Sequence, residues 1–276
     1  MSTVMSSPAN DLRVSLVQGE TLWHDPTGNR DYYGDLLHSL RGITDLAILP
    51  ETFTSGFSND AIAHAETMDG PTVAWLRQQA AHLDAAVCGS VQLRVDDAVF
   101  NRLLFATPEG GLLHYDKRHL FRYAGEHERY AAGEARLAVD WRGWRICPLV
   151  CYDLRFPVFS RNRFNAERAN APDYDLLLYV ANWPGVRAYP WKTLLRARAI
   201  ENLSYVAGVN RVGVDGNGLA YAGDSAVIDF LGQPVSECAD APIVATATLQ
   251  AEELRRHRER FPALLDADAF TLPGLP

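Results

Sequence analysis

Residues 145–157 read RICPLVCYDLRFP, and they combine an apolar, strand-like run with an abrupt end at Cys151. A charged and aromatic segment follows at once. Pro157 can begin a helix there, because the first turn of a helix does not need the N–H that proline lacks. A thiol at the tip of a strand, facing the start of the next element, is placed to attack a substrate. Cys151 is therefore the candidate nucleophile.

The composition is that of an ordinary globular protein. The chain has 276 residues, of which 47% are hydrophobic and 22% charged. A net charge of -8 without a lysine-rich block argues against nucleic acid as a partner. The longest apolar runs are far shorter than the ~20 residues of a membrane span, so no membrane is expected. Residues 1–10 are predicted to be a flexible tail without signal-peptide features, and residues 11–276 a single domain.

Four cysteines, at positions 88, 147, 151 and 238, are few for this length and favour a reduced, cytoplasmic protein. Buried packing is the ordinary role of such residues, and it is the interpretation for all of them except Cys151. No His/Cys cluster has the spacing of zinc ligands. There is no G-x-G-x-x-G and no P-loop. The sequence therefore predicts neither a metal nor a cofactor.

Hydrophobic periodicity predicts an α/β layered domain that includes some antiparallel pairing. Helices are expected at residues 29–40, 71–83, 191–202 and 250–260, with a short one near 158–160. Residues 122–133 are polar and aromatic and are expected to form a loop. Strands are expected at residues 12–18, 45–50, 86–93, 99–107, 112–115, 135–139, 144–150, 175–181, 205–211, 225–229 and 243–249.

Three reactive side chains each follow a predicted strand: Glu51, Lys117 and Cys151. Ligands of open α/β sheets gather beyond the carboxyl ends of strands, so the three can converge. A thiol is a poor nucleophile until a base takes its proton or a cation lowers its pKa. Glu51 can be the base, and Lys117 can stabilise a thiolate or an oxyanion. The backbone N–H of Tyr152 is a second candidate oxyanion donor.

Three blocks of sequence resemble the nitrilase superfamily of carbon–nitrogen hydrolases. They are LPETF at 49–53, YDKRHLF at 115–121 and CYDLRFP at 151–157, in the order Glu, Lys, Cys. The resemblance covers roughly the whole chain. It implies a four-layer α-β-β-α sandwich and a thioester mechanism without metal or cofactor. It also implies a homodimer that pairs through outer helices.

The resemblance also implies a second glutamate, which in the family stands seven residues before a glycine. Glu126 stands seven residues before Gly133, so that role is assigned to Glu126. Glu128, two residues further on, is the less favoured candidate. The implied role is to orient Lys117 and to assist proton transfer.

Residues 179–184, 194–202 and 208–213 resemble the bacterial omega-amidase branch of the superfamily. That branch hydrolyses the side-chain amide of α-ketoglutaramate or α-ketosuccinamate. Such a substrate carries a carboxylate, and Arg155 is the candidate to bind it, because a guanidinium can donate two hydrogen bonds to a carboxylate. An ion pair of Arg155 with Asp153 or Asp175 is the alternative. Trp183 is assigned to the substrate pocket, with simple packing as its alternative.

Other functions stay open at this point. The chain could be another amidase of the superfamily, acting on deaminated glutathione, a carbamoylated amine or a nitrile. It could also be a small-molecule-binding protein without activity. Taken alone, Glu51 could cap a turn and Lys117 could be a solvated charge. His119 is expected to face the core rather than the pocket. The joint presence of Glu51, Lys117 and Cys151 favours an enzyme with a small amide as its partner.

Overall fold

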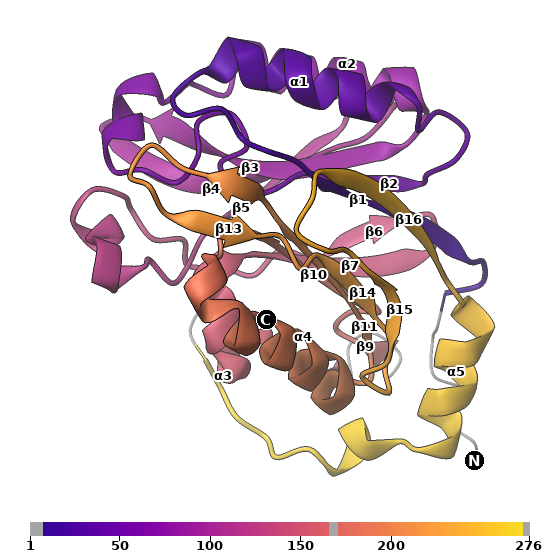
Figure 1. Cartoon of the computed structure of the whole chain (residues 1–276). Helices are drawn as coiled ribbons and strands as arrows, with labels where there is room; N and C mark the ends of the chain where they lie inside the picture. The colour runs from indigo at the N-terminus through magenta and orange to yellow at the C-terminus, as the bar shows by residue number, and fades with distance from the viewer. Residues whose placement is uncertain (1–7, 166–170, 273–276) are drawn as a thin grey trace.

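Two six-stranded sheets stack face to face, with helices on both outer faces, in the computed structural model of the chain (Figure 1). The structure describes residues 8–165 and 171–272. The predicted α-β-β-α sandwich is confirmed. The largest hydrophobic cluster joins residues of both sheets, including Leu16 and Ile48 on one and Ile146 and Leu178 on the other. This shared core holds the two sheets together.

The first sheet has three parallel strands at its centre. They are β1 (Leu12–Gln18), β2 (Leu46–Ile48) and β3 (Ala86–Val95). Antiparallel neighbours extend the sheet on both sides: β16 (Ile243–Leu249) beside β1, then β4 (Ala98–Ala106) and β5 (Leu112–Asp116) beyond β3. Two antiparallel steps separate β3 from β5. The strands β2 and β5 therefore run in the same direction, and both end at the same edge of the sheet.

The second sheet repeats this plan. Its parallel centre consists of β7 (Trp144–Val150), β10 (Leu176–Ala181) and β11 (Tyr205–Asn210). Antiparallel strands flank the centre: β6 (Val139–Trp141) on one side, then β14 (Ala226–Ile228) and β15 (Pro234–Glu237) on the other. Two further pairs lie outside the sheets, β12 (Val212–Val214) with β13 (Ala220–Ala222) and β8 (Phe164–Asn165) with β9 (Ala171–Pro172).

Helices α1 (Pro26–His38) and α2 (Pro71–Leu83) cover the outer face of the first sheet (Figure 1). Each begins with a proline, and α1 is capped by the Asp25 carboxylate, which accepts a hydrogen bond from the N–H of Gly28 at 2.9 Å. Helices α3 (Pro157–Ser160) and α4 (Ala188–Asn202) lie on the side of the second sheet, where Trp191 and Leu195 join the core. Helix α5 (Ala251–Arg260) follows β16. Among the described residues, no helix is long and apolar enough to span a membrane.

Two local predictions differ from the structure. The segment at 135–139 is irregular until β6 begins at Val139, because Arg136 turns inward. Its guanidinium donates to the carbonyls of Phe159 and Arg161 and pairs with Asp173. The expected loop at 122–133 contains two short 3₁₀ helices, η2 (Arg122–Ala124) and η3 (Glu126–Glu128). Residues 1–7 of the predicted tail lie outside the described residues, and the carbonyl of Asn10 accepts a hydrogen bond from the Trp144 indole at 2.7 Å.

Candidate active site

Strand ends from both sheets supply the candidate site. Glu51 follows β2 and Lys117 follows β5, at the shared edge of the first sheet. Cys151 follows β7 in the second sheet, and Asn182 follows the neighbouring parallel strand β10. The stacking of the two sheets brings these edges together. The structure thus unites all three residues that were predicted from strand ends, although they come from two sheets rather than one.

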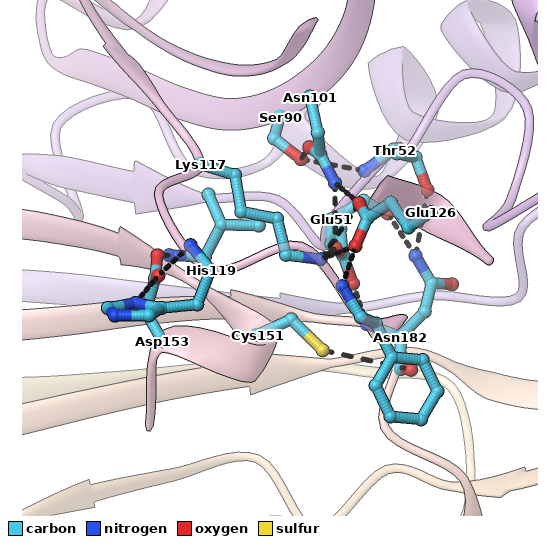
Figure 2. Close-up of polar contacts among 12 residues, drawn as sticks. Glu51, Thr52, Ser90, Asn101, Lys117, His119, Glu126, Cys151, Asp153 and Asn182 are labelled. Carbon is cyan, nitrogen blue, oxygen red and sulfur yellow. Dashed lines mark hydrogen bonds and ion pairs between the residues drawn. The ribbon is translucent and has the colours of Figure 1, made fainter. Parts of the chain in front are cut away.

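A buried ion-pair network forms the centre of the site (Figure 2). The Lys117 Nζ lies 2.9 Å from Oε1 of Glu51, and 3.0 Å and 2.9 Å from the two carboxylate oxygens of Glu126. All three side chains are almost completely excluded from solvent. A buried charge is tolerated only when it is paired and hydrogen-bonded, and here one ammonium group joins two carboxylates. The structure places Glu128 elsewhere, with a largely exposed side chain.

Asn101, on β4, connects the two carboxylates from the opposite side. Its amide nitrogen donates to Glu51 at 2.8 Å and to Glu126 at 3.3 Å. Its amide oxygen accepts from the Ser90 hydroxyl at 2.8 Å, and that hydroxyl accepts from the N–H of Thr52 at 2.9 Å. Asn101 is not among the residues predicted from the sequence. The signal that could have revealed it is an amide side chain in the middle of a largely apolar strand, which also carries Arg102.

Asn182 links the glutamate to the cysteine. Its backbone N–H donates to the second oxygen of Glu51 at 2.8 Å, and its side-chain amide donates to the Glu51 carbonyl at 2.6 Å. Its own carbonyl lies 4.0 Å from the Cys151 sulfur. Both oxygens of Glu51 are therefore held, and its carboxylate cannot turn away from the thiol. Asn182 was not predicted as a site residue, although it follows a strand as the other three do.

The backbone at Cys151 is left-handed, with φ at 43°. A residue with a β-carbon seldom adopts this conformation, and such strain is concentrated at functional sites. Asp153 stabilises the turn, because its carboxylate accepts from the N–H of Val150 at 3.0 Å and from the Tyr115 hydroxyl at 2.8 Å. The chain then enters the short 3₁₀ helix η4 (Cys151–Arg155), whose first N–H groups include that of Tyr152.

Gly133 closes the loop that carries Glu126. Its N–H donates to the Lys117 carbonyl at 3.0 Å. A β-carbon at this position would lie 2.1 Å from the carbonyl oxygen of Asp116, so a larger residue would push the loop away. Glu126 is held at the other side by the N–H of Phe121, at 2.5 Å. These contacts give a physical reason for a glycine seven residues after the glutamate.

Charges at the site determine where the protons reside. Burial alone would lower the pKa of Lys117, but the carboxylates of Glu126 and Glu51 raise it well above its ordinary value. Lys117 is therefore an ammonium ion at neutral pH. Burial and the charge of Glu51 raise the pKa of Cys151 well above that of a free thiol. The Cys151 thiol is thus protonated at rest, and to act as a nucleophile it would need a base.

A cavity of about 640 Å³ opens over this network. Glu51, Lys117, Cys151 and Asn182 form its floor. Its walls are largely aromatic, with charged groups between the rings. The wall residues include Phe57, Phe121, Tyr123, Tyr152, Trp183 and Tyr221, together with Arg129, Arg155, Arg187, Asp60 and Asp215. A concave pocket with a few convergent polar groups is the usual form of a small-molecule site.

Arg155 and Trp183 both line this cavity. The Arg155 guanidinium lies 4.9 Å from the centre of the Trp183 ring. The alternative of an ion pair with Asp153 is not realised, since that carboxylate binds Tyr115 and His119. The alternative with Asp175 is not observed either, as no hydrogen bond or ion pair of Arg155 occurs among residues 8–165 and 171–272.

His119 lies outside the cavity lining. Its ring stacks on Phe156 with the ring centres 3.8 Å apart, and it pairs with Asp153 at 2.7 Å. The expectation that it packs rather than contacts substrate agrees with this position. In the described part of the chain, no group of three or more His, Cys, Asp or Glu side chains is arranged to hold a metal ion.

Iodoacetamide is expected to label Cys151 before the other three cysteines. Cys151 faces the cavity, whereas Cys88, Cys147 and Cys238 are buried, and burial raises the pKa of Cys147 to about 12. The labelling rate should rise with pH up to and beyond pH 9, because the pKa of Cys151 is raised. Peptide mass spectrometry over a pH series measures this. A rate that levels off below pH 8 would contradict the protonated resting thiol.

Comparison with known proteins agrees with this geometry. The sequence model of the carbon–nitrogen hydrolase family matches residues 13–259. The chain belongs to the carbon–nitrogen hydrolase family. The predicted family is therefore confirmed, and the protein is a hydrolase of carbon–nitrogen bonds.

Individual relatives of this hydrolase resemble it over nearly its whole length. It is 48% identical to the omega-amidase YafV of Escherichia coli over 95% of this chain and 98% of that protein. It is 33% identical to the 2-oxoglutaramate amidase of Bacillus subtilis, over 80% of this chain and 84% of that one. The crystal structure of XC1258 from Xanthomonas campestris, which has an arsenic adduct in its active site, superposes with a TM-score of 0.94. It is 69% identical and covers 95% of this chain and 99% of that chain.

Proposed function

We propose that this hydrolase is an omega-amidase, which converts the ω-amide of a short 2-oxo acid into a carboxylate and ammonia. The observation that carries the proposal is the Glu51–Lys117–Glu126 network on the floor of a cavity that also holds Cys151 and an arginine without a carboxylate partner. The similarity to an omega-amidase and to a 2-oxoglutaramate amidase supports the choice of substrate. The substrates proposed are α-ketoglutaramate and α-ketosuccinamate.

Acylation begins at the thiol. Glu51 accepts the proton of Cys151 as the sulfur attacks the amide carbon, and the carbonyl oxygen becomes an oxyanion. The Lys117 ammonium and the N–H of Tyr152 stabilise that charge. The protonated Glu51 then donates its proton to the amide nitrogen. The carbon–nitrogen bond breaks, ammonia leaves and a thioester on Cys151 remains.

Deacylation uses the same groups. Glu51 accepts a proton from water while the water oxygen attacks the thioester carbon. Lys117 and Tyr152 again stabilise the oxyanion. The carbon–sulfur bond breaks, and the thiol recovers its proton from Glu51. Glu126 and Asn101 hold Lys117 and Glu51 in position through both steps. Every proton is returned, so no cofactor is required.

A screen of ammonia release tests the proposal. Amides of 2-oxo acids should be hydrolysed, whereas nitriles and carbamoylated amines should not. Activity on deaminated glutathione alone would favour that second amidase function instead. A protein that releases ammonia from none of these compounds, and forms no acyl adduct on Cys151, would be a binding protein.

Replacing Arg155 by alanine should raise the KM for α-ketoglutaramate by about 10- to 100-fold and change kcat less. Hydrogen bonds to charged groups contribute about 1.5–3 kcal/mol. The proposed bond between the Arg155 guanidinium and the substrate carboxylate is made equally in the ground state and the transition state, so its loss should act mainly on KM. Steady-state kinetics of ammonia release measure both constants. An unchanged KM would show that Arg155 does not bind the substrate carboxylate.

We also propose a homodimer that pairs through the outer helices and the C-terminal segment. Exposed apolar side chains on these elements support the proposal: Val158 on α3, Tyr189 and Ile200 on α4, and Phe261 after α5. Light scattering that gives the mass of a single chain would refute it. A cytoplasmic location is proposed because all four cysteines are free, and fractionation of cells tests it.

A further inference from the structure

We infer that Arg187 is a second specificity-determining cation, which binds the 2-oxocarboxylate end of the substrate together with Arg155, and that Trp183 links the Arg155 side chain to the Arg187 backbone. The inference rests on the proposed omega-amidase function and extends it. It explains how the pocket selects the position of the anionic group as well as its charge.

Arg187 ends the short 3₁₀ helix η6 (Gly185–Arg187) and lines the cavity. Its guanidinium lies 5.5 Å from the centre of the ring of Phe121, a residue that is distant from η6 in the sequence. The Arg155 guanidinium lies over the Trp183 ring in the same way, 4.9 Å from the ring centre. Within the described ranges, neither guanidinium has a hydrogen bond or an ion pair with a carboxylate. Aromatic faces hold both cations while their N–H groups stay free for a ligand.

Trp183 connects the two arginines. Its indole N–H donates to the carbonyl of Arg187 at 2.7 Å, and its ring faces Arg155. Trp183 is itself only 4% exposed. Its backbone N–H donates to the side chain of Asn210 at 2.8 Å, and the same side chain donates to the Trp183 carbonyl at 2.9 Å. One buried ring therefore contacts the Arg155 guanidinium and holds the backbone of Arg187.

A short segment of chain connects Arg187 to the base Glu51. Asn182 precedes Trp183 directly and donates to Glu51 from both its backbone and its side chain. The six residues from Asn182 to Arg187 thus join the base to the second cation. A substrate whose carboxylate is separated from its amide by the right number of carbons can place the amide at Cys151 and the carboxylate at the two arginines at the same time. This arrangement selects for chain length as well as for charge.

The other charges of the cavity do not neutralise these two arginines. Lys117 is paired with Glu51 and Glu126. The Asp215 carboxylate accepts from the N–H groups of Asn217 and Leu219 and from the Tyr221 hydroxyl. Asp60 and Arg129, whose charges are opposite to each other, are exposed residues of the cavity lining. The cavity lining therefore keeps two arginines, the exposed Arg155 and the half-buried Arg187, that have no carboxylate partner among the described residues, and these favour an anion with several oxygens, such as a 2-oxocarboxylate.

Two measurements test the inference. The first compares ammonia release from α-ketoglutaramate, glutaramate and pentanamide, which share the amide end and differ in the anionic end. Arg187→Ala should lower kcat/KM for the two anionic amides by about 10- to 100-fold, and thereby lower their preference over pentanamide. Arg187→Lys should recover only part of the loss, because an ammonium lacks the planar fork. Arg122→Ala, an exposed arginine outside the cavity lining, is the matched control and should change neither preference.

The second measurement does not require turnover. Calorimetry of 2-oxoglutarate, the product anion, with the Cys151→Ala protein should show binding about 10- to 100-fold weaker when Arg187→Ala is added. Unchanged binding and an unchanged preference in Arg187→Ala would overturn the inference even if the wild-type protein is an omega-amidase. Binding that depends on Arg187, in a protein that hydrolyses none of the three amides, would support the inference and overturn the proposed function.

Discussion

Cys151→Ala should lower kcat/KM for α-ketoglutaramate by about 10⁴-fold or more, since no thioester can form without the sulfur. The base, the ammonium and the pocket would remain, and such groups retain only a small residual catalysis once the nucleophile is lost. Intact-protein mass spectrometry during turnover should show an acyl adduct on the wild-type chain and none on the variant. Ammonia release measured on the same samples gives the loss of rate.

Cys147→Ala provides the matched control. Cys147 lies on the same strand β7, four residues before the candidate nucleophile, and is fully buried in the core. Cys147 is not among the residues that line the cavity of the candidate site, so the variant should keep the wild-type kcat within about threefold despite a small loss of packing. A Cys151→Ala protein that kept a tenth of the activity, or an adduct on Cys147, would refute the nucleophile assignment.

The strand-end positions of Glu51, Lys117 and Cys151 could be read from the sequence because each follows an apolar run. Such runs are the strongest local signal, and parallel strands bring their carboxyl ends to one edge. Glu126 could not be found this way, since it lies on a short 3₁₀ helix within a polar segment. Its assignment depended on the spacing to Gly133, for which the structure supplies the reason.

The rest of the site depends on contacts between elements that are distant in the sequence. Asn101 and Asn182 carry no titratable group, and their importance appears only when both lie beside Glu51. The cavity walls come from separate loops that include Phe57, Phe121 and Tyr221. The local hydrophobic pattern of a segment does not determine which strands pair with it or which sheets pack face to face. That is also why the short strands at the sheet margins, such as β15, were not predicted.

Lys117→Met should both inactivate and destabilise the protein. Removing a group that stabilises the oxyanion costs about 10²–10³-fold in kcat. In this variant the base Glu51 also loses its ion-pair partner Lys117. Two buried carboxylates, bridged only by the Asn101 amide, would face each other without the ammonium. Breaking a buried pair in this way costs about 3–5 kcal/mol of unfolding free energy. Urea unfolding and ammonia release measure the two effects.

The destabilisation should depend on pH in a predictable direction. Burial already raises the pKa of Glu126, and loss of the ammonium removes an interaction that lowers it. The folded variant should then bind a proton at a pH where the unfolded chain has released it. Its unfolding free energy should therefore increase as the pH falls towards the ordinary pKa of a glutamate. Relative to the wild type, the variant should lose less stability at pH 5.5 than at pH 8.

A second substitution separates structure from catalysis. Glu126→Gln, added to Lys117→Met, removes the repulsion and keeps the shape, so the double variant should recover most of the lost unfolding free energy at pH 8. It should stay inactive, because it lacks the Lys117 ammonium that stabilises the oxyanion. Recovery of activity along with stability would show that Lys117 serves only to balance charge. A Lys117→Met protein as stable as the wild type would show that the buried network does not carry the charges assigned to it.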